Sequence, residues 1–312
     1  MRKVPELSLL SYVNGSSADQ VQFVDDIMYG LKEYGFIVLN DHTVDQSKVD
    51  KAYELVNEFF ALPVETKLKY YNEEGGGQRG YTPFRTEHAK DNENPDLKEF
   101  WHVGREITKD HKFAKYYPLN IWPSEIAEFT KTFNELYSSM DMTSKILLEA
   151  IGRGLDVPKN FFNEMVTDGN SILRTIHYPP TQNQDTKNSV RAAAHEDINL
   201  ITMLVGATDS GLELLDRDGS WLPVSSKPGE IVVDTGDMMS RLTNDVLPAT
   251  THRVVNPDDS SSRRYSMPFF VHPHPEADLT CLSSCTNETP AKYPPITAHE
   301  FLMQRLKEIG LY

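Results

Sequence analysis

The sequence has little cysteine and no long hydrophobic run, and each absence excludes a class of protein. Cys281 and Cys285 are the only cysteines among 312 residues, so no disulfide framework holds the fold, although a bond between these two is chemically open. No stretch approaches the ~20 consecutive apolar residues of a transmembrane helix. The first residues lack the small-residue cleavage site of a signal peptide. We therefore expect a protein of the reducing cytoplasm.

Positive charge is scarce as well. The chain has 31 Lys and Arg against 46 Asp and Glu, which gives a formal net charge of −15. Such a surface repels nucleic acids and anionic membranes, so we predict neither as a partner. Glycines gather between residues 73 and 80, but they do not fit a phosphate-binding loop. We interpret residues 75–99 as either a lid over a substrate or an ordinary surface loop.

Hydrophobic periodicity predicts helices in the first half of the chain. A capping pattern at residues 17–20 begins a helix that ends near Gly35, and apolar residues at helical spacing continue over 45–60, 124–151 and 158–166. The apolar side of 124–151 is expected to be core. Short strands are predicted at 4–10 and 36–39, and 100–102 has the composition of a buried strand end.

The second half has the pattern of a β protein. Short apolar segments alternate with turns rich in Gly, Pro, Asp and Ser, which is typical of a sandwich or a barrel. These segments cover residues 172–178, 198–205, 212–215, 221–224, 231–234, 252–255 and 265–271. A last amphipathic helix begins at Thr297, and the sequence does not decide whether it packs on the body or at an interface between subunits.

The most informative stretch runs from Arg191 to Ser266. His195 and Asp197 are two positions apart, so in an extended chain both point to one side, whereas Glu196 points away. His252 follows after enough chain for several strands and a return. Two histidines and one carboxylate form the facial triad that binds non-haem Fe(II) and leaves three coordination positions open.

Arg264 and Ser266 share one face of a later strand in the same way. Arginine is the side chain best suited to bidentate binding of a carboxylate, and a serine hydroxyl can add one hydrogen bond. The adjacent Arg263 lacks a serine two positions later. We therefore expect Arg264 to bind an acidic ligand near the metal.

At these residues the chain resembles the isopenicillin N synthase-like family of Fe(II)/2-oxoglutarate oxygenases, as a bacterial-type member. The matching stretches are HYPP (177–180), HED (195–197), GLELLDRDGSWLPV (211–224), PGEIVVDTGD (228–237), THRVVN (251–256) and RRYS (263–266). The resemblance covers nearly the whole chain, more loosely in its first half. Plant members have an asparagine where this chain has Ile176, and His177 should point opposite its neighbour Tyr178.

The resemblance implies a set of site residues and cofactors. His195, Asp197 and His252 would bind Fe(II), whereas 2-oxoglutarate, the co-substrate beside O2, would contact Arg264, Ser266 and Tyr178; ascorbate is a further candidate, as reductant. Beyond the metal ligands no catalytic residue is assigned. The region that borders the substrate pocket in the family contributes Arg79, Tyr81 and His102 as pocket candidates.

The same resemblance implies the fold and the reaction. We expect a mixed α/β protein with a mainly β core, a double-stranded β-helix or jelly roll with the helices of the N-terminal half packed around it. A single domain would cover 1–312, with a mostly helical part (1–168), the catalytic jelly roll (169–275) and a C-terminal loop and helix (276–312). The reaction would convert 2-oxoglutarate to succinate and CO2 and oxidise a small molecule by hydroxylation, desaturation or cyclisation.

Other functions are compatible with parts of this pattern. A non-haem iron oxidase that does not use 2-oxoglutarate, of the isopenicillin N synthase or aminocyclopropanecarboxylate oxidase type, has the same iron ligands and the same arginine. An ethylene-forming enzyme that fragments 2-oxoglutarate is a special case of the first hypothesis. A jelly-roll binding protein without catalysis would have no need of an intact triad. The primary substrate and the oligomeric state do not follow from the sequence.

Overall fold

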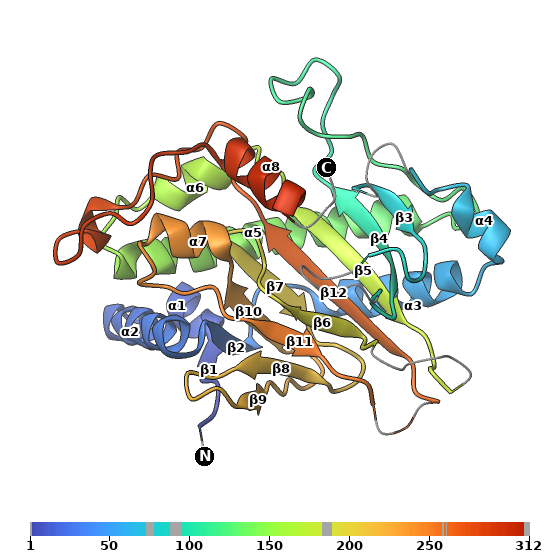
Figure 1. Cartoon of the computed structure of the whole chain (residues 1–312), viewed down its shortest axis with the longest axis horizontal. Helices are drawn as coiled ribbons and strands as arrows, with labels where there is room; N and C mark the ends of the chain where they lie inside the picture. The colour runs from blue at the N-terminus through green and yellow to red at the C-terminus, as the bar shows by residue number, and fades with distance from the viewer. Residues whose placement is uncertain are drawn as a thin grey trace.

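The computed structural model describes residues 2–72, 78–87, 95–182, 189–257, 259 and 261–308. Residues 75–77 and 88–94 of the predicted lid at 75–99 therefore lie outside the described residues. Two β-sheets form the centre of the protein and helices cover one side of the larger sheet (Figure 1). The coarse prediction, a mixed α/β protein with a mainly β core, is confirmed.

The larger sheet has eight strands in the order β1-β2-β10-β7-β12-β5-β4-β3, and the smaller has four in the order β6-β11-β8-β9. All neighbouring strands are antiparallel except β1 and β2. The bounds in the larger sheet are β1 Glu6–Ser8, β2 Phe36–Asp41, β3 Gly80–Thr82, β4 Glu99–Gly104, β5 Ile172–Tyr178, β7 Ile201–Val205, β10 Ile231–Thr235 and β12 Arg264–Val271. Those in the smaller sheet are β6 Ala192–His195, β8 Leu212–Leu215, β9 Trp221–Pro223 and β11 His252–Val254.

Alternation along the strands of the larger sheet divides their side chains between two environments. On β12, Tyr265, Met267 and Phe269 belong to the core beneath the helices, so Arg264 and Ser266 point to the opposite, inner face. On β2 and β10, the inner side chains include Phe36 and Val232, which share a second core with Leu214 of the smaller sheet. The inner face of the larger sheet is therefore turned toward the smaller sheet.

The helices are amphipathic and bury their apolar sides on the outer face of the larger sheet. Their bounds are α1 Leu9–Asn14, α2 Ser17–Tyr34, α3 Gln46–Phe60, α4 Val64–Leu68, α5 Phe129–Gly154, α6 Phe161–Val166, α7 Asp237–Leu242 and α8 Ala298–Glu308, with a 3₁₀ turn at Ser283–Cys285. The apolar side of α5 is fully buried, as predicted for a core helix. Among the helices of the described residues, none is both long and apolar enough to cross a membrane.

Several predicted boundaries differ from the structure. The capping box of α2 pairs Ser16 with Asp19, one residue earlier than predicted, because the Ser16 hydroxyl accepts from the Asp19 amide. α5 begins at Phe129 instead of residue 124, and the opening strand is shortened by α1. β6 was not predicted, since its run of alanines has weak strand preference. β3, α4 and α7 were also missed because each is very short.

The C-terminal helix packs on the body of the same chain. Phe301 and Leu306 are buried, and Arg305 forms a 2.7 Å ion pair with Asp237 at the start of α7. Thr297 and Glu300 form the predicted cap. Cys281 and Cys285 are both free thiols, so the cysteine pair contributes no covalent constraint.

Phe59 joins the helices to the larger sheet. Its ring contacts Tyr81, Trp101 and Phe129, and the side chain is fully buried.

Phe59→Ala should lower the free energy of unfolding by about 3–5 kcal/mol, because it removes a buried ring and leaves a cavity. Urea denaturation measures the change. Val21→Ala, at an exposed position on α2, should change stability by less than ~0.5 kcal/mol; equal losses in the two variants would contradict this account of the core.

Candidate metal centre

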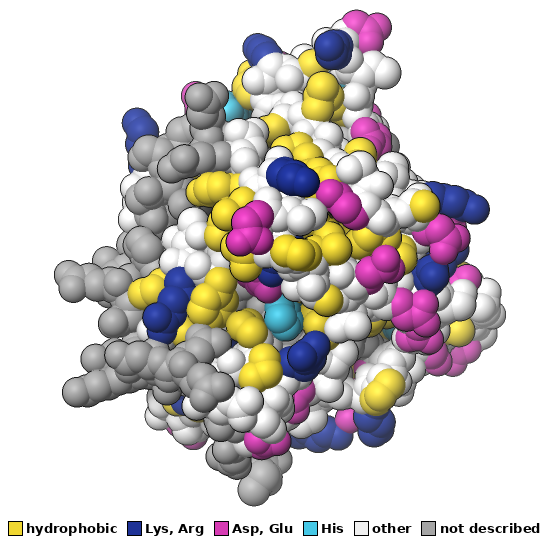
Figure 2. Space-filling view, turned by 90° about the vertical axis from the view of Figure 1, so that its right-hand side faces the viewer, with side chains coloured by type: hydrophobic (Ala, Val, Ile, Leu, Met, Phe, Trp, Pro, Cys, Tyr) yellow, Lys and Arg dark blue, Asp and Glu magenta, His cyan; other side chains and the backbone are white. Residues whose placement is uncertain are grey.

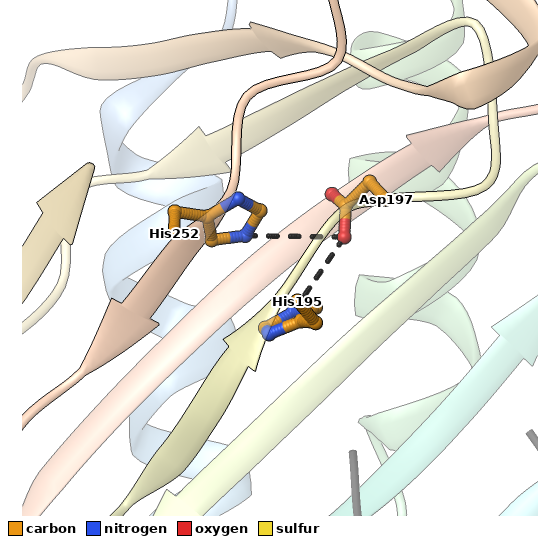
Figure 3. Close-up of side chains that lie close together, drawn as sticks. All are labelled: His195, Asp197 and His252. Carbon is orange, nitrogen blue, oxygen red and sulfur yellow. Dashed lines mark ion pairs between the residues drawn. The ribbon is translucent and has the colours of Figure 1, made fainter. Parts of the chain in front are cut away.

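Two histidines face each other across neighbouring strands of the smaller sheet. His195 ends β6 and His252 begins β11, and the two residues are direct cross-strand partners. Asp197 follows β6 and turns its carboxylate toward both rings (Figure 3). Strand pairing thus brings together residues that are far apart in the sequence.

The distances fit a single metal ion. The Nε2 atoms of His195 and His252 lie 3.8 Å and 3.9 Å from Oδ1 of Asp197, and one ligand atom from each residue falls within 4.8 Å of the others. Two ligand atoms at about 2.1 Å from one ion can lie up to about 4.2 Å apart. Of the described residues, only these three form a group of this kind.

Hydrogen bonds orient both imidazoles for metal binding. Nδ1 of His195 lies 2.7 Å from the carbonyl oxygen of Ala193, and Nδ1 of His252 lies 3.1 Å from that of Thr250. A carbonyl oxygen can only accept, so each Nδ1 carries the proton and each Nε2 keeps its lone pair. Burial, and after it the adjacent His252, lowers the pKa of His195 to about 4. The His195 ring is therefore neutral at neutral pH, as a metal ligand must be.

The Asp197 carboxylate is oriented by the larger sheet. The hydroxyl of Thr202, on β7, donates to Oδ2 of Asp197, and the amide of Asn199 donates to the Thr202 oxygen over 2.9 Å. This leaves Oδ1 directed at the histidines. Glu196 points away, as expected, and accepts from the hydroxyl of Thr251. Sequence reasoning missed Thr202, whose only signal was its position on a predicted strand.

A close backbone approach supports the Asp197 turn. The amide of Asp237 donates to the Asp197 carbonyl over 2.7 Å. A Cβ atom on Gly236 would lie 2.5 Å from the carbonyl oxygen of Asn199 and 2.8 Å from that of Asp197. A side chain at this position would therefore displace the loop that carries the carboxylate.

Arg264 is a buried cation that has no carboxylate partner among the described residues. Its guanidinium donates to the Ser266 hydroxyl and to the Asp209 carbonyl, each over 3.2 Å, and lies 5.0 Å from the centre of the Tyr178 ring. Tyr178 is its cross-strand partner on β5. An unpaired buried charge is costly, so this site suits an incoming carboxylate. Arg264, Ser266 and Tyr178, the three residues predicted to contact 2-oxoglutarate, lie next to one another.

Arg191 is a second buried arginine beside Tyr178, and sequence reasoning gave it no role. Its guanidinium forms a 3.3 Å ion pair with Asp209, donates to the Ser262 carbonyl over 2.9 Å and lies 5.9 Å from the Tyr178 ring centre. Because Arg191 has a counter-ion, the capacity to bind a further anion belongs to Arg264.

The three predicted pocket residues divide between the two faces of the larger sheet. Tyr81 packs against Phe59 on the helical side and donates to Glu99, so it lies away from the inner face that carries Arg264. His102 lies on the inner face, where the Arg174 side chain donates to it. The guanidinium of Arg79 covers Gly104, the next inward position on β4. Sequence alone could not assign these faces because the register of this strand was unknown.

A cavity of about 350 Å³ is lined by Met238, whose amide donates to the carbonyl of Ile198 in the segment that follows Asp197. It lies between α8 and the chain that follows β12, and its lining includes Tyr117, Asn170, Met238, His272, Leu302 and Leu306. Met238 follows Asp237, whose amide is bonded to Asp197. On the face seen in Figure 2, hydrophobic side chains gather around the centre with charges of both signs, and a histidine is visible among them.

Comparison with known proteins identifies the family. Residues 4–125 match the model described as the N-terminal region of the non-haem dioxygenase in morphine synthesis, and residues 169–273 match the 2OG-Fe(II) oxygenase superfamily. A 2-oxoglutarate-Fe(II) type oxidoreductase of Emericella nidulans is 31% identical over 97% of this chain and 89% of its own length.

Solved structures agree with this result. A 2OG-Fe(II) oxygenase family protein of Caulobacter crescentus is 46% identical, with a TM-score of 0.88 over 97% of this chain and 98% of that protein. A full-length protein of Neurospora crassa, solved in complex with alpha-KG and thymine, is 26% identical, with a TM-score of 0.87 over 97% of this chain and 96% of that one. The chain therefore belongs to the 2OG-Fe(II) oxygenase superfamily and is a non-haem dioxygenase that depends on Fe(II) and 2-oxoglutarate and uses O2 as co-substrate.

Proposed function

We propose that His195, Asp197 and His252 are the iron ligands and that Arg264, with Ser266 and Tyr178, binds 2-oxoglutarate. The observation that carries the proposal is the convergence of two Nε2 atoms and one carboxylate oxygen, each oriented by a separate hydrogen bond. The donor set fits Fe(II), because two imidazoles and one carboxylate leave three coordination positions for a chelating 2-oxo acid and O2.

The bound iron supplies the oxidative decarboxylation of 2-oxoglutarate to succinate and CO2 and the oxidation of a substrate C–H bond. The side chains of the protein position the co-substrate. Arg264 neutralises the carboxylate of 2-oxoglutarate that is far from the metal, and the Ser266 hydroxyl holds the guanidinium in position. Because Arg264 is almost fully buried, this ion pair is shielded from water and is stronger than a surface pair.

The two facing sheets support the finer fold proposal, a double-stranded β-helix. In it the smaller sheet carries both histidines and the larger sheet carries Arg264. We treat residues 1–312 as one domain, with the mostly helical part at 1–168, the catalytic core at 169–275 and the last helix packed on it. A reducing cytoplasm, which keeps iron ferrous and Cys281 and Cys285 reduced, is the compartment we propose.

The substrate is proposed to be a small molecule, oxidised by hydroxylation, desaturation or cyclisation. The 350 Å³ cavity between α8 and the chain that follows β12 has room for one. The Neurospora crassa protein, which resembles this chain along nearly its whole length, was solved with thymine and with 5-formyluracil. Ligands of that size are consistent with the cavity.

Anaerobic titration of the Fe(II)-loaded protein with 2-oxoglutarate tests the proposal. Chelation of iron by a 2-oxo acid should produce a weak visible charge-transfer band that saturates at one equivalent. His195→Ala and Asp197→Ala should abolish both iron binding and the band, because each removes a ligand. Full retention of iron in either variant would refute the ligand assignment. Iron binding without a band in the native protein would instead favour an oxidase that does not use 2-oxoglutarate.

Arg264→Ala should keep iron but weaken 2-oxoglutarate binding strongly. Loss of the partner of a buried charge costs about 2–5 kcal/mol, which corresponds to roughly 30-fold to several thousand-fold in affinity. The same band, titrated to saturation, gives the dissociation constant. Arg217→Ala, which removes a guanidinium exposed on the surface, is the control. An affinity equal to that of the control would place the carboxylate site elsewhere.

Thr202→Val should weaken iron binding by about 10–100-fold, because it removes the hydrogen bond that orients Asp197. The substitution conserves shape, so the fold should persist. Competition with a metal chelator measures the affinity. Thr43→Val removes a hydroxyl that contacts Thr143, far from the triad, and should leave iron affinity unchanged; an equal loss in both variants would contradict the role of Thr202.

A further inference from the structure

A second set of charged side chains lies on the inner face of the larger sheet, which is also the face of Arg264. Lys98 forms ion pairs of 2.7 Å with Glu87 and 2.8 Å with Asp96. Arg174 contacts both oxygens of Glu87, at 3.1 Å and 3.3 Å, and its Nε donates to His102 over 2.6 Å. We call Glu87, Asp96, Lys98 and Arg174 the paired-charge cluster.

The cluster adjoins the proposed iron site. Asp96 accepts from the backbone amide of Ala193 over 3.0 Å, and Ala193 belongs to the strand that ends at His195. On the opposite side, the Arg174 guanidinium lies 5.3 Å from the centre of the Phe270 ring. Phe270 is the cross-strand partner of Thr202, which binds Asp197. The cluster is thus connected to the triad through both sheets.

The charges in this cluster cancel. Two cations, Lys98 and Arg174, face two carboxylates, Glu87 and Asp96. Lys98 and Asp96 are the more deeply buried pair, with side-chain exposures of 7% and 4%, whereas Arg174 and Glu87 have 18% and 19%. Arg174 and Glu87 are therefore the members that can contact a ligand. Because their charges are already paired, neither a carboxylate nor an ammonium group gains an uncompensated partner here.

An uncharged ligand can still form hydrogen bonds at this pair. A guanidinium has five N–H donors, and the three contacts of Arg174 leave two of them. The Glu87 oxygens keep lone pairs that can accept. A ligand edge with one acceptor and one donor, such as an amide, would satisfy both.

Two aromatic rings flank the Arg174 guanidinium. Phe100 lies 4.3 Å from the Arg174 guanidinium, and Phe270 lies on the same cation. The Phe270 side chain is only partly buried, so part of its face is accessible. A planar group next to Arg174 would stack on such a surface.

We propose that the paired-charge cluster makes the enzyme selective for an uncharged substrate with a planar amide edge, as in a lactam, imide or carboxamide. This inference rests on the proposed iron site, since it places the substrate beside it. The two arginines of the inner face then have separate roles: the unpaired Arg264 attracts the anionic co-substrate, and Glu87 prevents Arg174 from competing for it.

Binding of matched neutral and anionic probes tests the inference. The full-length protein, loaded with Fe(II) and 2-oxoglutarate without oxygen, would be titrated by calorimetry with benzamide and benzoate and with uracil and orotate. The neutral member of at least one pair should bind at least about tenfold more tightly than its carboxylate, a difference of ~1.4 kcal/mol. Equal or tighter binding of both carboxylates, or no binding of either neutral probe at millimolar concentration, would overturn the proposal.

Glu87→Gln gives a readout that a purely structural role would not produce. The variant leaves the cluster with one net positive charge, so the preference should shift toward the carboxylate by about tenfold or more. A structural defect would weaken both probes alike, and that result would count against the proposal. Arg174→Gln should weaken the neutral probe without this gain for the anion.

Glu213→Gln is the matched control, because Glu213 accepts from Arg253 over 2.8 Å in the smaller sheet, and it should leave the preference unchanged. The charge-transfer band of the 2-oxoglutarate complex is recorded in every variant. Its absence from the native protein would refute the proposed complex of iron with 2-oxoglutarate, whereas a normal band without neutral preference would refute only the substrate class.

Discussion

The metal centre depends on the pairing of β6 with β11. This pairing sets His195 against His252, and the rest of the site is arranged around those two rings. The larger sheet then fixes the positions of the ligand side chains. Phe36 of β2 packs its ring edge-to-face on His252 at 5.5 Å, and Thr202 of β7 donates a hydrogen bond to Asp197. A shift of one residue in either sheet would turn these side chains to the wrong face. Sheet register is therefore a requirement of metal binding as well as of the core.

Two arginines on the inner face of the larger sheet have different hydrogen-bond partners. Within the described part of the chain, the buried Arg264 donates only to neutral acceptors, whereas Arg174 is held by a carboxylate. The difference lies in the partners that the neighbouring segments provide. The backbone amide of Asp96 donates to the carbonyl of Glu87 over 3.0 Å, which holds Glu87 next to the sheet. Our proposals assign the dianionic co-substrate to Arg264 and a neutral substrate to the surroundings of Arg174 on the same face.

The triad and the Arg264 site could be predicted from the sequence because their residues lie at short, regular spacings. His195 with Asp197, and Arg264 with Ser266, are each two positions apart on an extended segment, and most strands of the second half were placed within a few residues. Long-range register could not be predicted in this way. Thr202, Glu87 and Lys98 have ordinary local surroundings, so their roles follow only from pairing with distant strands. The face of the sheet that Tyr81 occupies could not be predicted for the same reason, since a single residue of register decides it.

The Asp197 loop also connects the metal centre to the wall of the cavity. The backbone amide of Asp237 is bonded to the Asp197 carbonyl, and its carboxylate pairs with Arg305 of α8. One residue thus touches the chain that holds a metal ligand and the helix that lines the cavity. Because both contacts are made by the first residue of α7, a displacement of α8 would act on the loop of Asp197 through Asp237. The position of the cavity wall and the position of the carboxylate are therefore set by the same short segment.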